Sequence, residues 1–155
     1  MRLTRQSDYA IRVAMGLATS PGYASDVATL CRRQGMPAAY GAKVVQALAR
    51  AGLVVTTRGA RGGVRLSRPP EAISLLDVVE AVEGPTVFTR CMLWPGECPE
   101  PERCALHPVL DGLRQAVTGY LGAISVAELV RRHQLAAQQG DARETSGRGA
   151  GALLG

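Results

Sequence analysis

The first 52 residues mix apolar and polar positions with the period of α-helices, and short breaks divide them into segments. From Thr4 to about Thr19 the apolar residues recur at intervals of three and four, and Thr4 is a residue type that caps helices. The apolar stripe of this segment consists of Ala10, Val13, Ala14 and Leu17. The pattern predicts a first amphipathic helix.

Two shorter apolar segments follow, and Gly35 separates them. They predict one helix from about Ser25 to Gln34 and another from Met36 to about Ala51. The core-facing positions expected in the second of these helices are Tyr40, Val44 and Leu48. Two short helices joined by a turn that contains glycine are typical of a helix-turn-helix motif.

Residues 53–67, LVVTTRGARGGVRLS, have the composition of a β-hairpin. β-Branched and apolar residues alternate in 54–57 and 64–66, and a glycine-rich connection lies between them. The connection carries Arg58 and Arg61. The segment therefore predicts a basic wing next to the helix-turn-helix motif.

Three further helices are predicted in the second half of the chain: one in 69–84, a long one in 108–124, and a short one in 126–133 that Ser125 caps. The apolar stripe of the long helix consists of Leu110, Leu113, Val117, Tyr120 and Leu121. Because a winged domain closes its core without this helix, we expect the stripe to pack against a second copy and form a homodimer.

The expected fold class is mainly α with a small β-hairpin wing: a winged helix-turn-helix plus a long dimerisation helix. We expect a DNA-binding domain at 1–70 and a cysteine loop with dimerisation helices at 71–136. Residues 137–155 are rich in Gly, Ala, Arg and Ser and offer little to bury, which predicts a disordered tail.

The charge of the chain changes sign near residue 70, where we expect the DNA-binding domain to end. Residues 1–70 contain 11 Arg and Lys against two acidic residues, a balance of +9, whereas the remainder stands at −4. A basic half of this kind suits a polyanion such as double-stranded DNA.

No apolar run approaches the length of a membrane span and the first residues lack a signal-peptide pattern, so we expect a cytoplasmic protein. The chain has no phosphate-binding loop, paired-carboxylate or Ser/His/Asp pattern, so we do not expect an enzyme.

The solvent face of the helix in 36–51 offers the expected DNA contacts, because the second helix of such a motif enters the major groove. Lys43 and Gln46 are the expected readers of base edges, and the small Ala39 allows a close approach to the groove floor. The expected phosphate ligands, which position the protein without reading sequence, are Arg50, Arg58 and Arg61. A dimer predicts a pseudo-palindromic operator.

Three of the four cysteines, Cys91, Cys98 and Cys104, cluster with His107 in CMLWPGECPEPERCALH. In a reducing compartment such residues serve metals or redox chemistry more often than structural disulfides. Zinc sites usually contain C-x-x-C pairs, which this segment lacks, whereas thiolates spaced along a Pro- and Gly-rich loop can surround an iron–sulfur cluster. The residues favour a cluster and leave open zinc, a thiol redox switch and an incidental grouping.

Four features follow one another in a specific order: MRLTRQSDYAIR, RGARGGVRLSRPPEAISLLDVVEAVEG, the three cysteines, and TGYLGAISVAELV. Together they resemble the Rrf-two family of bacterial winged-helix regulators, which includes IscR, NsrR and RirA. The resemblance covers residues 1 to about 133. It implies a homodimeric transcription factor, a repressor, that senses nitric oxide, redox state or iron supply through a cluster bound by Cys91, Cys98 and Cys104.

For the fourth ligand the resemblance implies alternatives. His107 matches a histidine that completes a 2Fe-2S cluster in IscR-like members, and Asp8 matches a carboxylate that reaches a 4Fe-4S cluster from the partner subunit in NsrR-like members. The wing is closer to the NsrR and RirA side, which favours Asp8, and an exogenous ligand is the third alternative. Carboxylate and imidazole are more exchangeable iron ligands than thiolate, which suits a sensor. The alternative function is a cluster-free or zinc-bound regulator of the same fold that responds to thiol oxidation or a protein partner.

Overall fold

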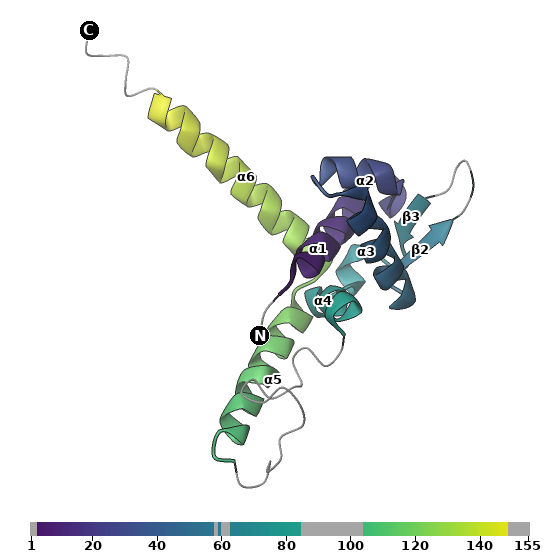
Figure 1. Cartoon of the computed structure of the whole chain (residues 1–155). Coiled ribbons are helices and arrows are strands. Elements are labelled where there is room, and N and C mark those ends of the chain that lie inside the picture. The colour runs from purple at the N-terminus through teal and green to yellow at the C-terminus, as the bar shows by residue number, and fades with distance from the viewer. Residues whose placement is uncertain (1–2, 58, 60–62, 85–103, 149–155) are drawn as a thin grey trace.

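A computed structural model describes residues 3–57, 59, 63–84 and 104–148, with side-chain environments as far as residue 139. Within this part of the chain, a small sheet lies at one edge of a helical body, beside α2 and α3, and α5 and α6 extend away from that body in different directions (Figure 1). The predicted mainly α architecture with a β wing is confirmed. The elements are α1 (Arg5–Ala18), η1 (Pro21–Tyr23), β1 (Ala24–Ser25), α2 (Val27–Arg33), α3 (Ala38–Arg50), β2 (Val54–Thr57), β3 (Gly63–Leu66), η2 (Pro70–Ala72), α4 (Leu75–Glu83), α5 (His107–Ala123) and α6 (Val126–Arg148).

Polar side chains cap the starts of several helices. Thr4 and Ser125 each accept a backbone N–H at 3.1 Å, so both predicted caps are confirmed. The cap of α2 is Asp26, which accepts the N–H of Thr29 at 2.7 Å, and the helix therefore begins at Val27, slightly later than predicted. Hydrogen bonds from the Thr29 hydroxyl and then its N–H hold the pKa of Asp26 below its ordinary value.

The sheet has three antiparallel strands in the order β1-β3-β2. The predicted hairpin is confirmed, with Val54 opposite Leu66 and Thr57 opposite Gly63. The pattern did not predict β1, because two residues are too few for a periodic signal. β1 approaches closely at Gly63, where an added Cβ would lie 2.9 Å from the carbonyl oxygen of Ser25.

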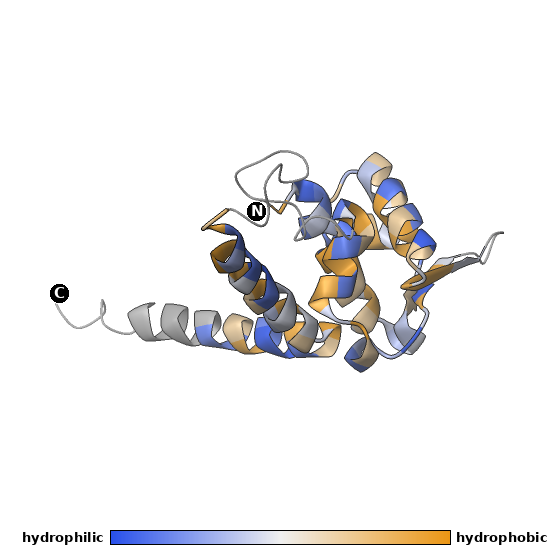
Figure 2. Ribbon diagram, turned by 90° about the horizontal axis from the view of Figure 1, so that it is seen from below, coloured by the Kyte–Doolittle hydropathy of each residue, from blue (hydrophilic) through white to orange (hydrophobic). Residues whose placement is uncertain are grey.

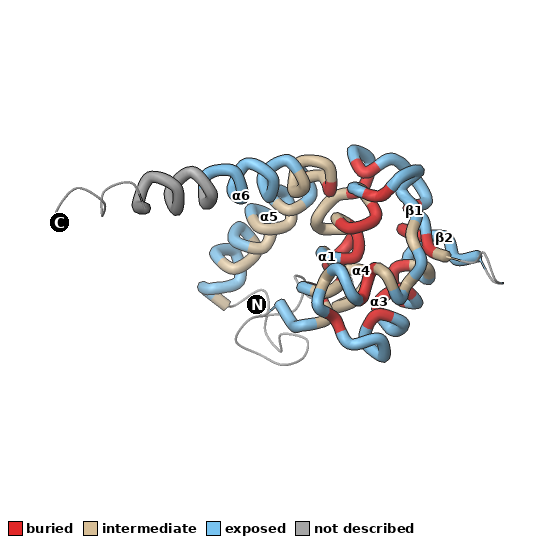
Figure 3. Tube along the Cα trace, turned by 90° about the horizontal axis from the view of Figure 1, so that it is seen from above, coloured by how far each residue is buried: buried red, intermediate tan, exposed pale blue. Residues whose placement is uncertain are grey.

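The core lies where α1, α2, α3, α4 and the sheet meet, as the buried segments of Figure 3 show. The four predicted positions of the α1 stripe are all buried, which confirms the face assigned to that helix. Outside this stripe, the residues with at most 1% exposure are Ser7, Leu30, Val44, Leu48, Val64, Ile73, Val78, Val79 and Val126. The second helix of the motif, α3, and the β2–β3 hairpin are thus held by one shared core.

Tyr40 departs from the prediction that it faces this core, because it is 49% exposed. Its ring packs instead against Tyr9, with the centroids 5.7 Å apart and the planes tilted by 58°. The next residue, Gly41, takes the inward position in this turn, because a Cβ there would lie less than 3.0 Å from Sγ of Cys31 in α2. The two helices of the motif approach too closely at this point for a larger side chain.

The start of α4 is joined to the junction of α5 and α6 by two backbone hydrogen bonds. The N–H of Leu75 donates to the carbonyl oxygen of Ile124, and that of Val126 donates to Ile73, both at 2.8 Å. No residue of α5 is buried, and hydrophilic and hydrophobic residues are interspersed along its ribbon (Figure 2). α5 is therefore joined to the body through α4 and through Ile124, the residue that follows it, while much of its surface faces solvent.

The helix α6 continues to Arg148, beyond the end predicted for it at residue 133, and the disorder expected of residues 137–155 stays a prediction. The segment after His133 is rich in Ala, Gln and Arg, which are strong helix formers, and two glycines do not interrupt the helix. Residues 149–155 lie outside the described residues. Among the described helices, none combines the length and the apolar character that crossing a membrane requires.

Candidate functional site

The solvent face of α3 carries the side chains that the sequence assigned to DNA. Ala39, Lys43, Gln46 and Arg50 are all exposed. The opposite face holds Val44 in the core, so the orientation of the exposed row is determined by packing. Arg50 Nε lies 3.4 Å from the carbonyl oxygen of Gln46, a long contact that leaves the guanidinium available to an outside anion.

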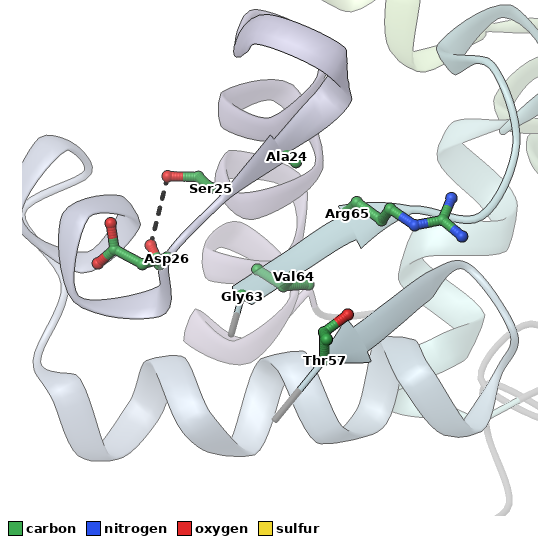
Figure 4. Close-up of a pocket in the computed structure, with 7 residues that line it drawn as sticks. All are labelled: Ala24, Ser25, Asp26, Thr57, Gly63, Val64 and Arg65. Carbon is green, nitrogen blue, oxygen red and sulfur yellow. Dashed lines mark hydrogen bonds between the residues drawn. The ribbon is translucent and has the colours of Figure 1, made fainter. Parts of the chain in front are cut away.

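The base of the wing lies beside the start of α2, and an open hollow separates them (Figure 4). In this view Asp26 and Arg65 stand at opposite sides of the hollow, and the Arg65 side chain points away from the carboxylate. The lining residues are Ala24, Ser25, Asp26, Thr57, Gly63, Val64 and Arg65. The predicted wing-tip residues Arg58 and Arg61 lie outside the described residues.

Asp8, the carboxylate proposed from the sequence as a ligand, lies exposed in the first turn of α1. Its Oδ1 accepts a hydrogen bond from Arg12 Nε, one turn later, at 2.9 Å. The ion pair joins two half-exposed side chains, so its contribution to stability is small, at about 0.3–0.5 kcal/mol. It restrains the direction of the carboxylate.

Cys104 and His107 lie together at the start of α5. The N–H of His107 donates to the carbonyl oxygen of Cys104 at 3.1 Å, the thiol is half-buried and free, and the imidazole is exposed. Cys91 and Cys98 lie outside the described residues. Within the described ranges, no three His, Cys, Asp or Glu side chains gather into a group able to hold a metal ion. Asp8 is therefore not brought together with Cys104 and His107 in the single chain.

The pattern missed one polar cluster, at the contact between α1 and α4. Glu83, the last residue of α4, accepts hydrogen bonds from Thr4 and from the buried hydroxyl of Ser7. Burial alone would raise the pKa of Glu83, but the hydrogen bonds from Ser7 and then Thr4 outweigh it and lower the pKa. The partners are more than 70 residues apart in the chain, so no local signal could have revealed them.

A helix-turn-helix motif, an antiparallel wing and an exposed, partly basic row on the second helix of the motif define a winged helix-turn-helix DNA-binding protein. The family model Rrf2, described as "Iron-dependent Transcriptional regulator", matches residues 3–132. The chain belongs to the Rrf2 family of DNA-binding transcriptional regulators and is not an enzyme, which confirms both predictions.

Individual relatives agree with this assignment. "Protein aau3" of Rhizobium meliloti (strain 1021) is 37% identical over 133 residues, which cover 84% of this chain and 86% of the relative. The HTH-type transcriptional regulator IscR of Xenorhabdus nematophila is 32% identical over 136 residues, covering 87% and 82%. Among solved structures, the oxidized form of Staphylococcus aureus CymR is 25% identical with a TM-score of 0.65, covering 84% of this chain and 96% of that one.

Proposed function

We propose that this regulator is a homodimeric repressor that reads a pseudo-palindromic operator and responds to nitric oxide, redox state or iron supply through an iron–sulfur cluster. The observation that carries the DNA part is the exposed row on α3, in a half of the chain with a charge balance of +9. Residues 1–70 bind DNA in this proposal, and residues 71–136 sense the signal and form the dimer.

On the operator, Lys43 and Gln46 read base edges in the major groove, because a cation suits guanine O6 and N7 and an amide suits adenine. Ala39 lets the helix approach the groove floor. Arg50 binds a phosphate near the end of α3, and Arg58 and Arg61 extend the phosphate contacts from the wing.

For the sensor, Cys91, Cys98 and Cys104 supply thiolates, and Asp8 of the second subunit or His107 supplies the fourth ligand. The donor set fits an iron–sulfur group, and the position of Cys104 next to His107 at the start of α5 supports the proposal. Such a cluster, when bound, supplies iron that reacts with nitric oxide, oxygen or peroxide.

The Asp8 alternative has support from the first turn of α1. Arg12 occupies Oδ1 of Asp8 and leaves Oδ2 without a described partner. Arg12 would therefore orient the carboxylate while one oxygen stays open to a metal. Because Asp8 stands apart from Cys104 in the single chain, this alternative needs the second subunit.

The first test is to purify the protein without oxygen and to measure iron, acid-labile sulfide and zinc per protomer. Absorption and Mössbauer spectra then distinguish 2Fe-2S from 4Fe-4S.

We expect Cys104→Ala to lose iron, whereas Cys31→Ala, which removes a buried thiol in the α2–α3 contact, keeps it. Altered spectra in Asp8→Ala but not in His107→Ala would identify the carboxylate as the ligand, and the reverse would identify the imidazole. Iron-free wild-type protein would contradict the cluster.

The second test measures binding to operator DNA against salt. We expect the logarithm of the association constant to fall by about 0.9 per log unit of salt for each phosphate contacted. Binding that does not change with salt would contradict the assignment of the basic half.

A second candidate is a cluster-free or zinc-bound regulator that responds to thiol oxidation or to a protein partner. One observation favours it: a related regulator, CymR, has been crystallised in an oxidized form. In this case mild peroxide would change the DNA affinity of iron-free protein, and Cys104→Ala would abolish the change. Stoichiometric zinc instead of iron would also support this candidate.

A further inference from the structure

One carboxylate oxygen joins the beginning of α1 to the end of α4. Oε1 of Glu83 accepts the N–H of Thr4 at 3.2 Å, the hydroxyl of Thr4 at 2.5 Å, and the hydroxyl of Ser7. Ser7 is 0% exposed, so solvent cannot take the place of Glu83 as the acceptor for its hydroxyl. We name this group of three residues the Glu83 clamp.

The clamp also places a negative charge at the positive end of α1. The first N–H groups of a helix lack intrahelical acceptors, and a carboxylate at this end is favoured by the helix dipole. Hydrogen bonds to an ionised acceptor are about twice as strong as neutral ones. The hydrogen bonds that the Glu83 carboxylate accepts are therefore stronger than hydrogen bonds between neutral side chains would be.

The start of α4 is also held by hydrogen bonds to another part of the structure. The hydrogen bonds between Leu75 and Ile124 and between Val126 and Ile73 join it to the α5–α6 junction. α1 in turn packs against α3 in the shared core. The structure thus contains a continuous path from α5, through both ends of α4, to α1 and the DNA-reading helix.

We propose that Glu83 is a positioning residue, which holds the first turn of α1 on the end of α4 and thereby fixes α3 relative to α5. The signalling part of this inference rests on the proposed function, because Asp8, the proposed ligand, follows Ser7 directly in that turn. Loss of the clamp then weakens the coupling between the first turn of α1 and the DNA-reading helix α3.

The local part is tested on metal-free protein by amide hydrogen exchange. Glu83→Ala removes all three hydrogen bonds, and we expect exchange in residues 5–10 to become at least tenfold faster, with little change in residues 13–18. The matched control is Glu80→Ala, one turn earlier on α4, for which no hydrogen bond to α1 is found among the described residues. Unchanged exchange in Glu83→Ala would overturn the clamp.

The coupling part compares the DNA affinity of iron-loaded and iron-free protein. A residue that only stabilises the fold would lower the melting temperature and leave the ratio of the two affinities unchanged. We expect Glu83→Ala to bring this ratio at least fivefold closer to one, while Glu83→Gln, which keeps an acceptor oxygen, preserves most of the wild-type ratio. A folded Glu83→Ala protein with the wild-type ratio would refute the coupling.

Two further outcomes keep the inference separate from the proposed function. If wild-type protein shows one affinity in both states, the proposed signal fails, and hydrogen exchange alone decides on the clamp. If Glu83→Ala does not fold, Ser7→Ala takes its place, because it removes one donor without removing the Thr4 cap. In that variant we expect exchange in the first turn of α1 at least threefold faster than in wild type, and an unchanged rate would overturn the clamp.

Discussion

Gly41 marks the closest approach of the two helices in the DNA-binding motif, and Gly41→Ala tests how that approach positions α3. The added Cβ would lie less than 3.0 Å from Sγ of Cys31, whereas nonbonded heavy atoms normally stay about 3.5–4.0 Å apart. The next atoms are Val27 Cγ1 at 3.7 Å and Met36 Cε at 3.9 Å, which are ordinary contacts. The clash is thus confined to one sulfur atom.

Two opposing terms decide the outcome. Replacing glycine by alanine in a helix gains at most about 1 kcal/mol, and Gly41 lies in the first turn of α3, where the gain is smaller. Overpacking a closed core costs about 1–3 kcal/mol. We therefore expect a net loss of about 1–2 kcal/mol, which corresponds to a melting temperature lower by about 2–8 °C for a chain of this size.

Urea and thermal unfolding, followed by circular dichroism, measure the loss, and a double mutant tests its cause. Cys31→Ala removes the sulfur, and the remaining atoms lie at least 3.7 Å from the new Cβ. Gly41→Ala should then cost little in the Cys31→Ala background, a coupling of about 1–3 kcal/mol. Gly112→Ala is the control, because among the described residues no atom outside its own stretch of helix lies within 4 Å of its added Cβ. A Gly41→Ala protein as stable as wild type, or one that Cys31→Ala does not rescue, would refute the reasoning.

The remaining predictions concern acid stability, DNA binding and assembly. The lowered pKa of Glu83 contributes stability that is present above its ordinary value of 4.5 and is lost as the pH falls below it, so Glu83→Gln should flatten the acid decline in urea unfolding. Burial and then Asp77 raise the pKa of Glu80, whose ionisation costs stability, so Glu80→Gln should gain stability above pH 4.5. Lys43→Ala should cost about 1–3 kcal/mol and relax base preference in operator titrations, whereas Arg50→Ala should weaken all sequences alike and lower the salt slope by about 0.9. Leu113→Glu should yield monomers in sedimentation equilibrium, and a persisting dimer would contradict the interface proposed for α5.

Features set by a few neighbouring residues could be predicted from the sequence. Thr4 and Ser125 cap their helices as expected, and the apolar stripe of α1 faces the core, because helix periodicity and capping depend on residues within one or two turns. The exposure of Lys43, Gln46 and Arg50 followed from the same periodicity. Their contacts with DNA stay a prediction.

Two departures from the prediction depend on contacts between distant segments. Tyr40 was expected inside because its spacing to Val44 is helical, but the close passage of α2 leaves room only for Gly41 beside it. The Glu83 clamp joins residues more than 70 positions apart in the chain, and neither segment carries a pattern that points to the other. The cysteine site shares this difficulty, because spacing identifies candidate ligands and only the fold can bring them together.

The proposed dimer has a consequence for how DNA binding depends on protein concentration. α5 contains 17 residues and buries none of them in the single chain, while Leu113 and Tyr120 are 48% and 63% exposed. Most helical stability in proteins comes from packing an apolar face against other parts of the structure. If a second copy supplies that packing, folding of α5 and association form one equilibrium. α5 is joined to the start of α4, and α4 contacts α1 and α3. Dilution that separates the subunits would therefore loosen α5 and, through α4, the positioning of α1 and α3. Operator affinity would then be lower at lower protomer concentration.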